Sequence, residues 1–244
     1  MSIAAPVQSA FVERISHLVD KVRYHSVHRP EEREAIFRLR YDAYRREGMI
    51  AANFSRQFSD HYDDMENARL FGVYFDDKLV SSIRISVISA QHPMSPSAEI
   101  FPEFIQPWID AGQTVIDPTR FVVDHAAARL YPELAYITIR LAPLACEYFH
   151  ADQLLAAVRA EHQAFYRRVS GHSTICPPRA WPALAKPLAL MKVDVNGIRG
   201  SLYDRYPFFR STLAERQALF GRRPQMAVAE RSASSDRREA VLET

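Results

Sequence analysis

The chain has 244 residues, enough for one large domain or two small ones with a substantial core. Its composition, 48% apolar and 25% charged, is typical of a soluble globular protein, and a formal net charge of +2 does not by itself indicate a nucleic-acid partner. No apolar run reaches the roughly 18 to 20 residues of a membrane-spanning helix, and we recognise no secretory signal, so we expect a cytoplasmic protein.

The first 21 residues are predicted to form a leader with a short helix, and residues 22–27 to form a first strand. The next helix is expected from Pro30 to about Glu47, because proline fits the first turn of a helix and Gly48 follows as a stop signal. Its aromatic residues recur at helical spacing on one face, which indicates an amphipathic helix; they are Phe37, Tyr41 and Tyr44.

Residues 49–69 lose this periodicity and gather polar side chains. A loop of this length is uncommon in a compact domain unless it has a function. Strands are predicted at residues 70–75 and 79–88, joined by a hairpin turn at 76–78. Residues 89–111 are expected to be irregular.

The stretch 113–124 is rich in β-branched and aromatic residues and predicts a further strand. Pro118 cannot donate to a sheet ladder, so we expect a bulge or a splayed strand, a feature often found beside active sites. Asp117 and Arg120 lie on either side of this irregularity, and we predict that they form an ion pair. An edge strand with a solvated ion pair is the alternative interpretation.

The C-terminal half is predicted to contain five elements and a tail. These are a buried helix at residues 134–149 that Pro143 kinks, a strand at 153–158, a helix at 160–169, strands at 173–176 and 188–195, and a disordered tail at 221–244. The order of elements indicates one mixed α/β domain that spans residues 22–220.

The two cysteines, Cys146 and Cys176, do not have the spacing of a metal site, and we predict no metal. A cytoplasmic chain keeps such thiols reduced. Either thiol could act as a nucleophile, but a free cysteine is more often a small buried hydrophobe.

Arg84 stands among residues of the second hairpin strand that should be half-buried. A buried arginine without a carboxylate partner destabilises the fold by several kcal/mol, so we expect Asp60, Asp63 or Asp117 to pair with it. Such a network could also serve only to fix the long loop to the sheet.

Several short motifs now occur in one order along the chain. They are Phe37-Arg38-Leu39-Arg40-Tyr41, Asp60-x-Tyr62-Asp63, Arg84, Asp117-x-x-Arg120-Phe121-Val122-Val123-Asp124, and the segments 159–169 and 204–209. In order and spacing they resemble the autoinducer-synthase branch of the GNAT acyltransferase superfamily, and most of all the long-chain N-acyl amino acid synthases of the FeeM type. The resemblance implies a GNAT-like domain with a central mixed, mostly antiparallel twisted sheet, a splayed strand and flanking helices.

The resemblance also implies a reaction. A fatty acyl group would move from the phosphopantetheine thioester of acyl carrier protein to the amine of an amino acid, with no tightly bound cofactor. Homoserine-lactone synthases usually carry Glu where this chain has Asp117, which suggests a different amine acceptor. The glycine-rich pyrophosphate loop of GNAT enzymes is absent from residues 125–132. Since glycines let backbone N–H groups close on phosphate, this favours a carrier-protein donor over coenzyme A.

Three residues are candidates for catalysis. Asp117 could take the proton of the amine if its pKa is raised, whereas a lowering of that pKa by Arg120 would favour an orienting role instead. Tyr166 lies where GNAT enzymes often carry a tyrosine and could protonate the leaving thiolate, or it could be a core aromatic. Backbone N–H groups at the splayed strand would bind the oxyanion. Expected substrate-binding residues are Arg40, Asp60, Asp63, Arg84 and Phe121.

Basic residues could attract an acidic carrier protein. They are Arg33, Arg38, Arg40, Arg45 and Arg46 on the first helix, with Arg167, Arg168, Arg205 and Arg210 further on. A solvated helix face balanced by acids is the alternative for the first helix. The apolar segments 134–149 and 187–195 would suit an acyl channel or a plain core. A coenzyme A dependent GNAT N-acetyltransferase and a non-catalytic GNAT-like module that binds carrier protein or acyl chains remain alternative functions.

Overall fold

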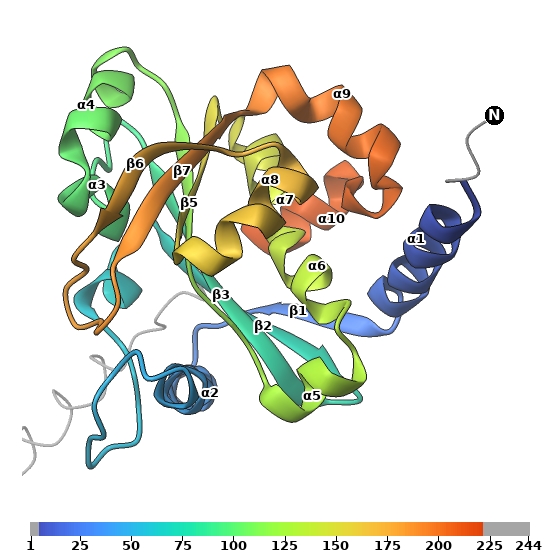
Figure 1. The fold of residues 1–244 in the computed structure, drawn as a ribbon, viewed down its shortest axis with the longest axis horizontal. Coiled ribbons are helices and arrows are strands. Elements are labelled where there is room, and N and C mark those ends of the chain that lie inside the picture. Colours follow the sequence, from blue (N-terminus) through green and yellow to red (C-terminus); the bar gives the residue numbers. More distant parts are fainter. Residues whose placement is uncertain (1–4, 222–244) are drawn as a thin grey trace, which may run out of the picture.

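The computed structural model describes residues 5–221, which form a seven-stranded sheet covered by helices on both faces (Figure 1). The strand order is β1-β2-β3-β4-β5-β7-β6, and every neighbouring pair is antiparallel except β4 and β5. The strands are β1 (Val22–Ser26), β2 (Ala68–Phe75), β3 (Lys78–Ile88), β4 (Val115–Val123), β5 (Gln153–Val158), β6 (Ser173–Arg179) and β7 (Leu188–Asp194). This confirms the predicted mixed, mostly antiparallel sheet.

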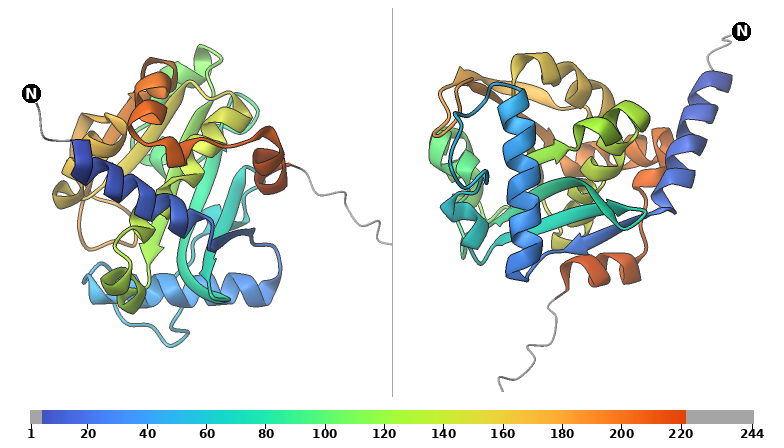
Figure 2. Two further views of the ribbon diagram at one scale, coloured as in Figure 1. Left: turned by 90° about the vertical axis from the view of Figure 1, so that its right-hand side faces the viewer. Right: turned by 90° about the horizontal axis from the view of Figure 1, so that it is seen from below.

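The helices divide between the two faces of the sheet (Figures 1 and 2). One face carries α2 (Pro30–Arg46), α3 (Pro96–Ile100) and α4 (Pro102–Asp110), with the short helix η1 (His61–Asp64). The other face carries α1 (Ala5–Val19), α5 (His125–Leu130), α6 (Leu134–Ile139), α7 (Leu141–Phe149), α8 (Gln163–Ser170), α9 (Val195–Arg205) and α10 (Leu213–Phe220). We call these the α2 face and the α7 face.

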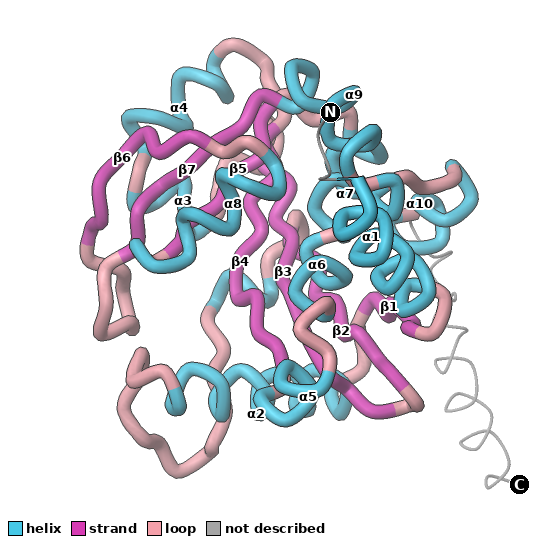
Figure 3. The backbone as a smooth tube through the Cα atoms, turned by 45° about the vertical axis from the view of Figure 1, so that its right-hand side comes forward, coloured by secondary structure: helices cyan, strands magenta, loops and turns pink. Residues whose placement is uncertain are grey.

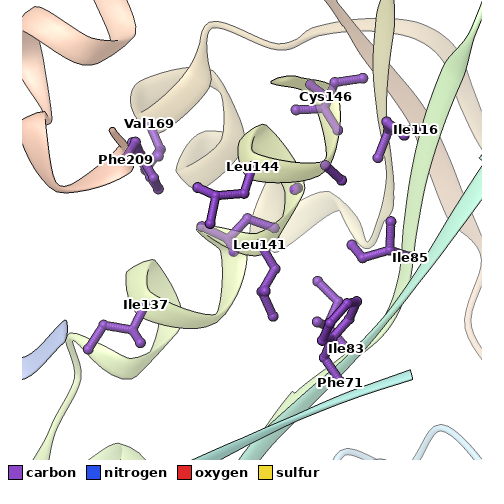
Figure 4. Packing of buried hydrophobic residues seen from close by; sticks show 14 of the residues in the cluster. Phe71, Ile83, Ile85, Ile116, Ile137, Leu141, Leu144, Cys146, Val169 and Phe209 are labelled. Atoms are coloured by element: carbon purple, nitrogen blue, oxygen red, sulfur yellow. The ribbon is translucent and has the colours of Figure 1, made fainter. Parts of the chain in front are cut away.

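Each face has its own apolar core. Alternate residues of β3 and β4, such as Ile83, Ile85 and Ile116, pack with Leu141 and Leu144 on the α7 face (Figure 4). On the α2 face, a second cluster unites Ile88, Val115 and Leu155 with residues of α2, α3 and α4. Ile15 of α1 is fully buried in the larger core, so the N-terminal helix packs on the domain.

Two segments differ from their predictions. Residues 89–111, expected to be irregular, contain α3 and α4, each opened by a proline in its first turn. Residues 134–149 form two helices that meet at Arg140, because Pro143 falls in the first turn of α7, where its missing N–H is not needed. The predicted tail at 222–244 lies outside the described residues.

The sheet opens between β4 and β5 (Figure 3). Their parallel ladder contains only the pairs Val115–Gln153 and Ile116–Leu154, and Pro118 follows shortly after the last pair. The predicted splayed strand is therefore present. A bulge is also present: two residues of β4, Arg120 and Phe121, oppose the single residue Ile83 of β3.

Candidate active site

A network of buried charges lies on the α2 face of the opening. Arg84 of β3 points to this face because its neighbours Ile83 and Ile85 point to the other. It is fully buried and donates hydrogen bonds to Asp60, to Asp63 at 3.0 Å and to the Thr119 hydroxyl at 3.0 Å. The predicted carboxylate partners of Arg84 are thus confirmed as Asp60 and Asp63.

The long polar loop supplies both carboxylates from η1. Asp60 caps this helix by accepting from the Tyr62 N–H at 3.1 Å, and Asp63 accepts from the Asp60 N–H at 3.0 Å. Arg40 of α2 donates to the two oxygens of Asp63 at 2.8 and 3.0 Å. Arg120 of β4 donates twice to Asp60 Oδ2, at 3.0 and 2.6 Å. The network joins α2, η1, β3 and β4.

The members of the network differ in the exposure of their side chains and in the pKa shifts that burial and neighbouring charges produce. Burial lowers the pKa of Arg40 to about 10, and its Nε and Nη2 atoms have no hydrogen-bond partner. Burial also opposes the charge of Asp60, but Arg84 and Arg120 hold its pKa at about 2. Arg40, Arg84 and Asp63 have side chains at most 1% exposed, whereas Asp60 keeps 18%. Arg120 is 5% exposed, so Asp60 is the most accessible member of the network and the first three residues support it from behind.

The predicted ion pair between Asp117 and Arg120 is wrong. Asp117 is fully buried and accepts from the hydroxyls of Ser95 at 2.7 Å and Ser97 at 2.8 Å, and from the Ser97 N–H at 3.3 Å. Arg120 lies in the bulge with a left-handed φ of 54°, which turns its side chain to Asp60. Sequence spacing alone does not reveal this change of backbone direction.

The pKa of Asp117 is consequently set by other groups than expected. Burial raises it, while the hydroxyls of Ser95 and Ser97, the Ser97 N–H and the charge of Arg84 oppose the shift. Arg120 is not among the groups that act most strongly on it, so of the two alternatives left open by the sequence the structure favours a raised pKa. Among the described carboxyl groups with a resolved shift, Asp117 is the one whose pKa is raised.

An apolar pocket occupies the opening on the α7 face. Pro118 of β4 and Leu154 and Leu155 of β5, the residues at which the strands diverge, form one wall. The remaining lining comes from α6, α7, α8 and the segments that follow: Ile139, Ala142, Pro143, Phe165, Tyr166, Val169, Ser170, His172, Leu202 and Phe209. Part of the predicted channel segment 134–149 is present, but no residue of 187–195 lines this pocket.

Tyr166 lines the pocket, and Tyr44 of α2 lies beside the charged network. Burial raises the pKa of Tyr166, and the charge of Tyr44 adds to the shift. Burial opposes the charge of Arg120, but Tyr44, by charge and by a hydrogen bond, and Asp60 raise its pKa. The guanidinium also lies 4.4 Å from the ring centre of Phe58. Arg120 is thus held between Asp60 and the rings of Tyr44 and Phe58.

Several residues of the site are not predicted from the sequence, and one predicted substrate-binding residue lies elsewhere in the structure. Phe121 packs against the core of the α7 face, away from the charged network. Tyr44 was assigned only to an amphipathic face. Ser95 before Pro96 is a helix-capping pattern that could have been recognised. No sequence signal distinguishes His172, an isolated histidine before β6.

Within residues 5–221 no group of three or more His, Cys, Asp or Glu side chains could hold a metal ion. No helix in the same part of the chain is both long and apolar enough to cross a membrane. Cys146 and Cys176 are both buried, and burial raises the pKa of the Cys146 thiol, which suits a packing role.

The matching family model and one solved structure point to the same family. The family model of the N-acyl amino acid synthase FeeM matches residues 35–194. The structure is similar to that of FeeM, an N-acyl amino acid synthase from uncultured soil microbes, with a TM-score of 0.63 and 21% identity over 77% of this chain and 97% of that chain. No curated protein matches the chain in sequence.

Two acyl-homoserine lactone synthases share the fold. The CoA-dependent synthase BjaI, solved with SAM and isopentyl-CoA, gives a TM-score of 0.52 and 17% identity over 76% of this chain and 90% of that chain. The AHL synthase LasI gives a TM-score of 0.54 and 12% identity over 72% of this chain and 89% of that chain.

Proposed function

Because the chain belongs to the FeeM family of N-acyl amino acid synthases and is therefore an N-acyltransferase, we propose that it transfers a long-chain acyl group from the thioester of an acyl carrier protein to the amine of an amino acid. One observation carries this proposal: where β4 and β5 diverge, an apolar pocket lies on one face of the sheet and a charged network on the other. A thioester donor and a zwitterionic acceptor need these two environments.

The donor enters from the α7 face. The pocket is apolar on nearly all sides, which suits an acyl chain and the methylene groups of a phosphopantetheine arm. Segment 125–132 supports a carrier-protein donor, because it forms the glycine-free helix α5, and Asp124 already accepts from the Ala127 N–H at its start. Backbone N–H groups that a pyrophosphate would need are thus partly engaged.

The acceptor binds on the α2 face. Asp60 and Arg120, the most exposed charged members of the network, offer one negative and one positive group for an ammonium and a carboxylate. Tyr44 and Phe58 form an aromatic wall beside them, with ring centres 4.9 Å apart. The remaining buried charges keep this pair fixed.

The chemical step requires the amine to lose a proton and the thiolate to gain one. Asp117 is the base, because its raised pKa suits proton uptake, and the proton reaches this buried carboxylate through the hydroxyl of Ser95 or Ser97. Tyr166 is the acid: its raised pKa keeps the phenol protonated, and it lines the pocket where the thioester sulfur lies. The acyl carbon–sulfur bond breaks as the carbon–nitrogen bond forms.

Exposed arginines on α8 and α9 form the docking surface for the carrier protein. Arg167 donates to Gln163 and Thr174, Arg168 to Tyr136, and Arg205 to the Arg168 carbonyl, so their charges are not neutralised by acids within residues 5–221. On α2, Arg33 pairs with Asp64, Arg38 with Glu34, and Arg40 is internal, while Arg45 donates to the Ile50 carbonyl. The docking surface flanks the pocket, which α8 and α9 help to line.

The test is product analysis with purified protein. Long-chain acyl carrier protein and a mixture of the amino acids are incubated with the wild type, and N-acyl amino acids are identified by mass spectrometry. We expect one predominant product, and none with Tyr166→Phe beyond about 1% of the wild-type rate, since an acid contributes about 10² to 10⁴ in rate. Turnover with acyl-CoA but not with acyl carrier protein would contradict the proposed donor. Lipid extracts of overproducing cells provide the acceptor independently.

A further inference from the structure

His172 is the polar group in the donor pocket whose hydrogen bonding is incomplete. Its side chain is 3% exposed, it lines the pocket, and its Nε2 atom has no hydrogen-bond partner. A buried polar atom left in this state destabilises the free protein, typically by about 1–3 kcal/mol. A ligand that supplies the missing partner would therefore gain from this atom.

The neighbours of His172 fix which kind of partner it needs. Ser170 Oγ donates to the Tyr166 carbonyl at 3.3 Å and so accepts from Nδ1–H of His172, 2.8 Å away. With the proton on Nδ1, Nε2 is an acceptor. Burial lowers the pKa of His172 to about 4, so the ring is neutral near pH 7. The backbone of Leu155 and Leu154 opposes this shift, but neither residue reaches Nε2 with the geometry of a hydrogen bond. Nε2 of His172 can therefore accept a hydrogen bond from an N–H group of a ligand in the pocket.

We propose that Nε2 of His172 accepts a hydrogen bond from the amide N–H nearest to the sulfur of the donor's pantetheine arm. An amide in an apolar pocket also needs a partner, so each group satisfies the other. The rings of His172 and Tyr166 have centres 5.6 Å apart, and two carbons separate the thioester sulfur from that amide. A sulfur next to the Tyr166 phenol thus places this amide, rather than the more distant one, beside His172.

This inference rests on the proposed thioester donor, but it does not depend on whether the arm belongs to a carrier protein or to coenzyme A, because both carry the same amide. His172 is accordingly a binding residue for the donor. It also makes the pocket selective for thioesters with an amide at this distance over simple alkyl thioesters.

The experiment measures binding of two matched probes by calorimetry. One is S-octyl-N-acetylcysteamine, and the other is its ester analogue, in which oxygen replaces the amide N–H. Neither reacts, so acceptor and turnover are not needed. We expect the wild type to bind the amide about three- to tenfold more tightly than the ester, the effect of one neutral hydrogen bond. His172→Leu should bind both equally, and His172→Asn should keep part of the preference.

Two further variants keep the result decisive if His172→Leu does not fold. Ser170→Ala removes the group that fixes the proton on Nδ1 and should reduce the preference for the amide. Phe165→Leu, the control, removes only apolar contact in the same pocket and should weaken both probes by the same factor. A wild type without preference, or a His172→Leu variant that keeps it, overturns the proposal.

Activity assays separate this inference from the proposed function. With acyl carrier protein and acyl-CoA of equal chain length, His172→Leu should lower kcat/KM for both donors by one factor. Loss with only one donor would overturn the contact to the shared arm. If the amide preference depends on His172 but no N-acyl amino acid forms, the proposed acceptor fails while the donor contact stands.

Discussion

On the α2 face of the opening, charged side chains close into a network in which Asp60 and Asp63 each accept from two arginines. On the α7 face, the pocket is apolar and one of its few polar atoms, Nε2 of His172, has no partner. In the first region every carboxylate is paired, although two nitrogens of Arg40 have no partner, whereas in the second region an unpaired nitrogen lies in an apolar wall. We therefore regard the α2 face as a rigid frame and, in our proposal, the donor supplies the missing hydrogen bond on the α7 face.

The largest expected effect concerns Asp117 on the α2 face and tests whether this residue acts as a base or only stabilises the fold. Asp117→Asn should lower kcat by at least about 100-fold, because an amide cannot take a proton from the amine. The Asn oxygen can still accept from the Ser95 hydroxyl and the Ser97 N–H, and its NH2 group can donate to the Ser97 hydroxyl, so the thermal midpoint should change little. Asp124→Asn, which preserves a helix cap at the end of the same strand, is the control. Unchanged kcat in Asp117→Asn would reduce Asp117 to a structural residue.

The next experiment tests the rigidity of the frame. Asp63→Asn should destabilise the fold by about 3–5 kcal/mol, because it leaves Arg40 and Arg84 buried with too little negative charge. The adjacent Asp64 is exposed and pairs with Arg33, so Asp64→Asn should cost less than about 1 kcal/mol. Urea unfolding measures both. If the two variants lose a similar free energy of unfolding, the buried network does not stabilise the α2 face.

The pocket face should respond to pH more than the network does near neutrality. The pKa of His172 is about 4 in the fold against 6.5 in the unfolded chain, so the unfolded state binds more protons as the pH falls below 6.5. Stability is complete above 6.5 and should be about 2 kcal/mol lower at pH 5, at 1.36 kcal/mol per pKa unit. The contribution of Asp60 is lost only at lower pH, from 3.8 towards about 2.

The measurement is the thermal or urea midpoint of the wild type and His172→Asn between pH 7 and 5. His162 shifts in the same direction as His172, so the difference between the two proteins, rather than the slope of either, reports on His172. Parallel curves would mean that His172 is hydrated and the pocket is not closed around it.

The smallest effect concerns the docking surface. Arg167→Glu with Arg205→Glu should raise KM for acyl carrier protein about three- to tenfold at low salt, with little change for acyl-CoA, because surface charges steer an acidic partner and salt screens them. Arg38→Glu on α2, already neutralised by Glu34, is the matched control. Equal effects of the three changes on both donors would contradict docking at α8 and α9.

The sequence was informative where a physical requirement leaves few solutions. A buried Arg84 demands carboxylates, and the long polar loop provided Asp60 and Asp63. Pro118 predicted the opening of the sheet correctly. The predicted Asp117–Arg120 pair is absent, because Asp117 accepts from Ser95 and Ser97 while Arg120 donates to Asp60. These partners come from segments that only the fold brings together.

Other features depended on long-range packing. The helices α3 and α4 lie in a segment whose prolines suggest a loop. In fact each proline lies in the first turn of a helix. Tyr44 and His172 gain their surroundings only in the folded chain: the ring of Tyr44 lies 5.6 Å from the guanidinium of Arg120, and His172, just before β6, lines the pocket.

The short ladder between β4 and β5 has one more consequence. Past Ile116, the middle of the sheet carries backbone without a neighbouring strand, which in most proteins invites a strand from another molecule and leads to aggregation. Here Pro118 lacks the N–H that an incoming strand would use, and the turn of the chain at Arg120 breaks the flat template. The two residues that keep this gap free for a substrate also protect the protein from associating with itself.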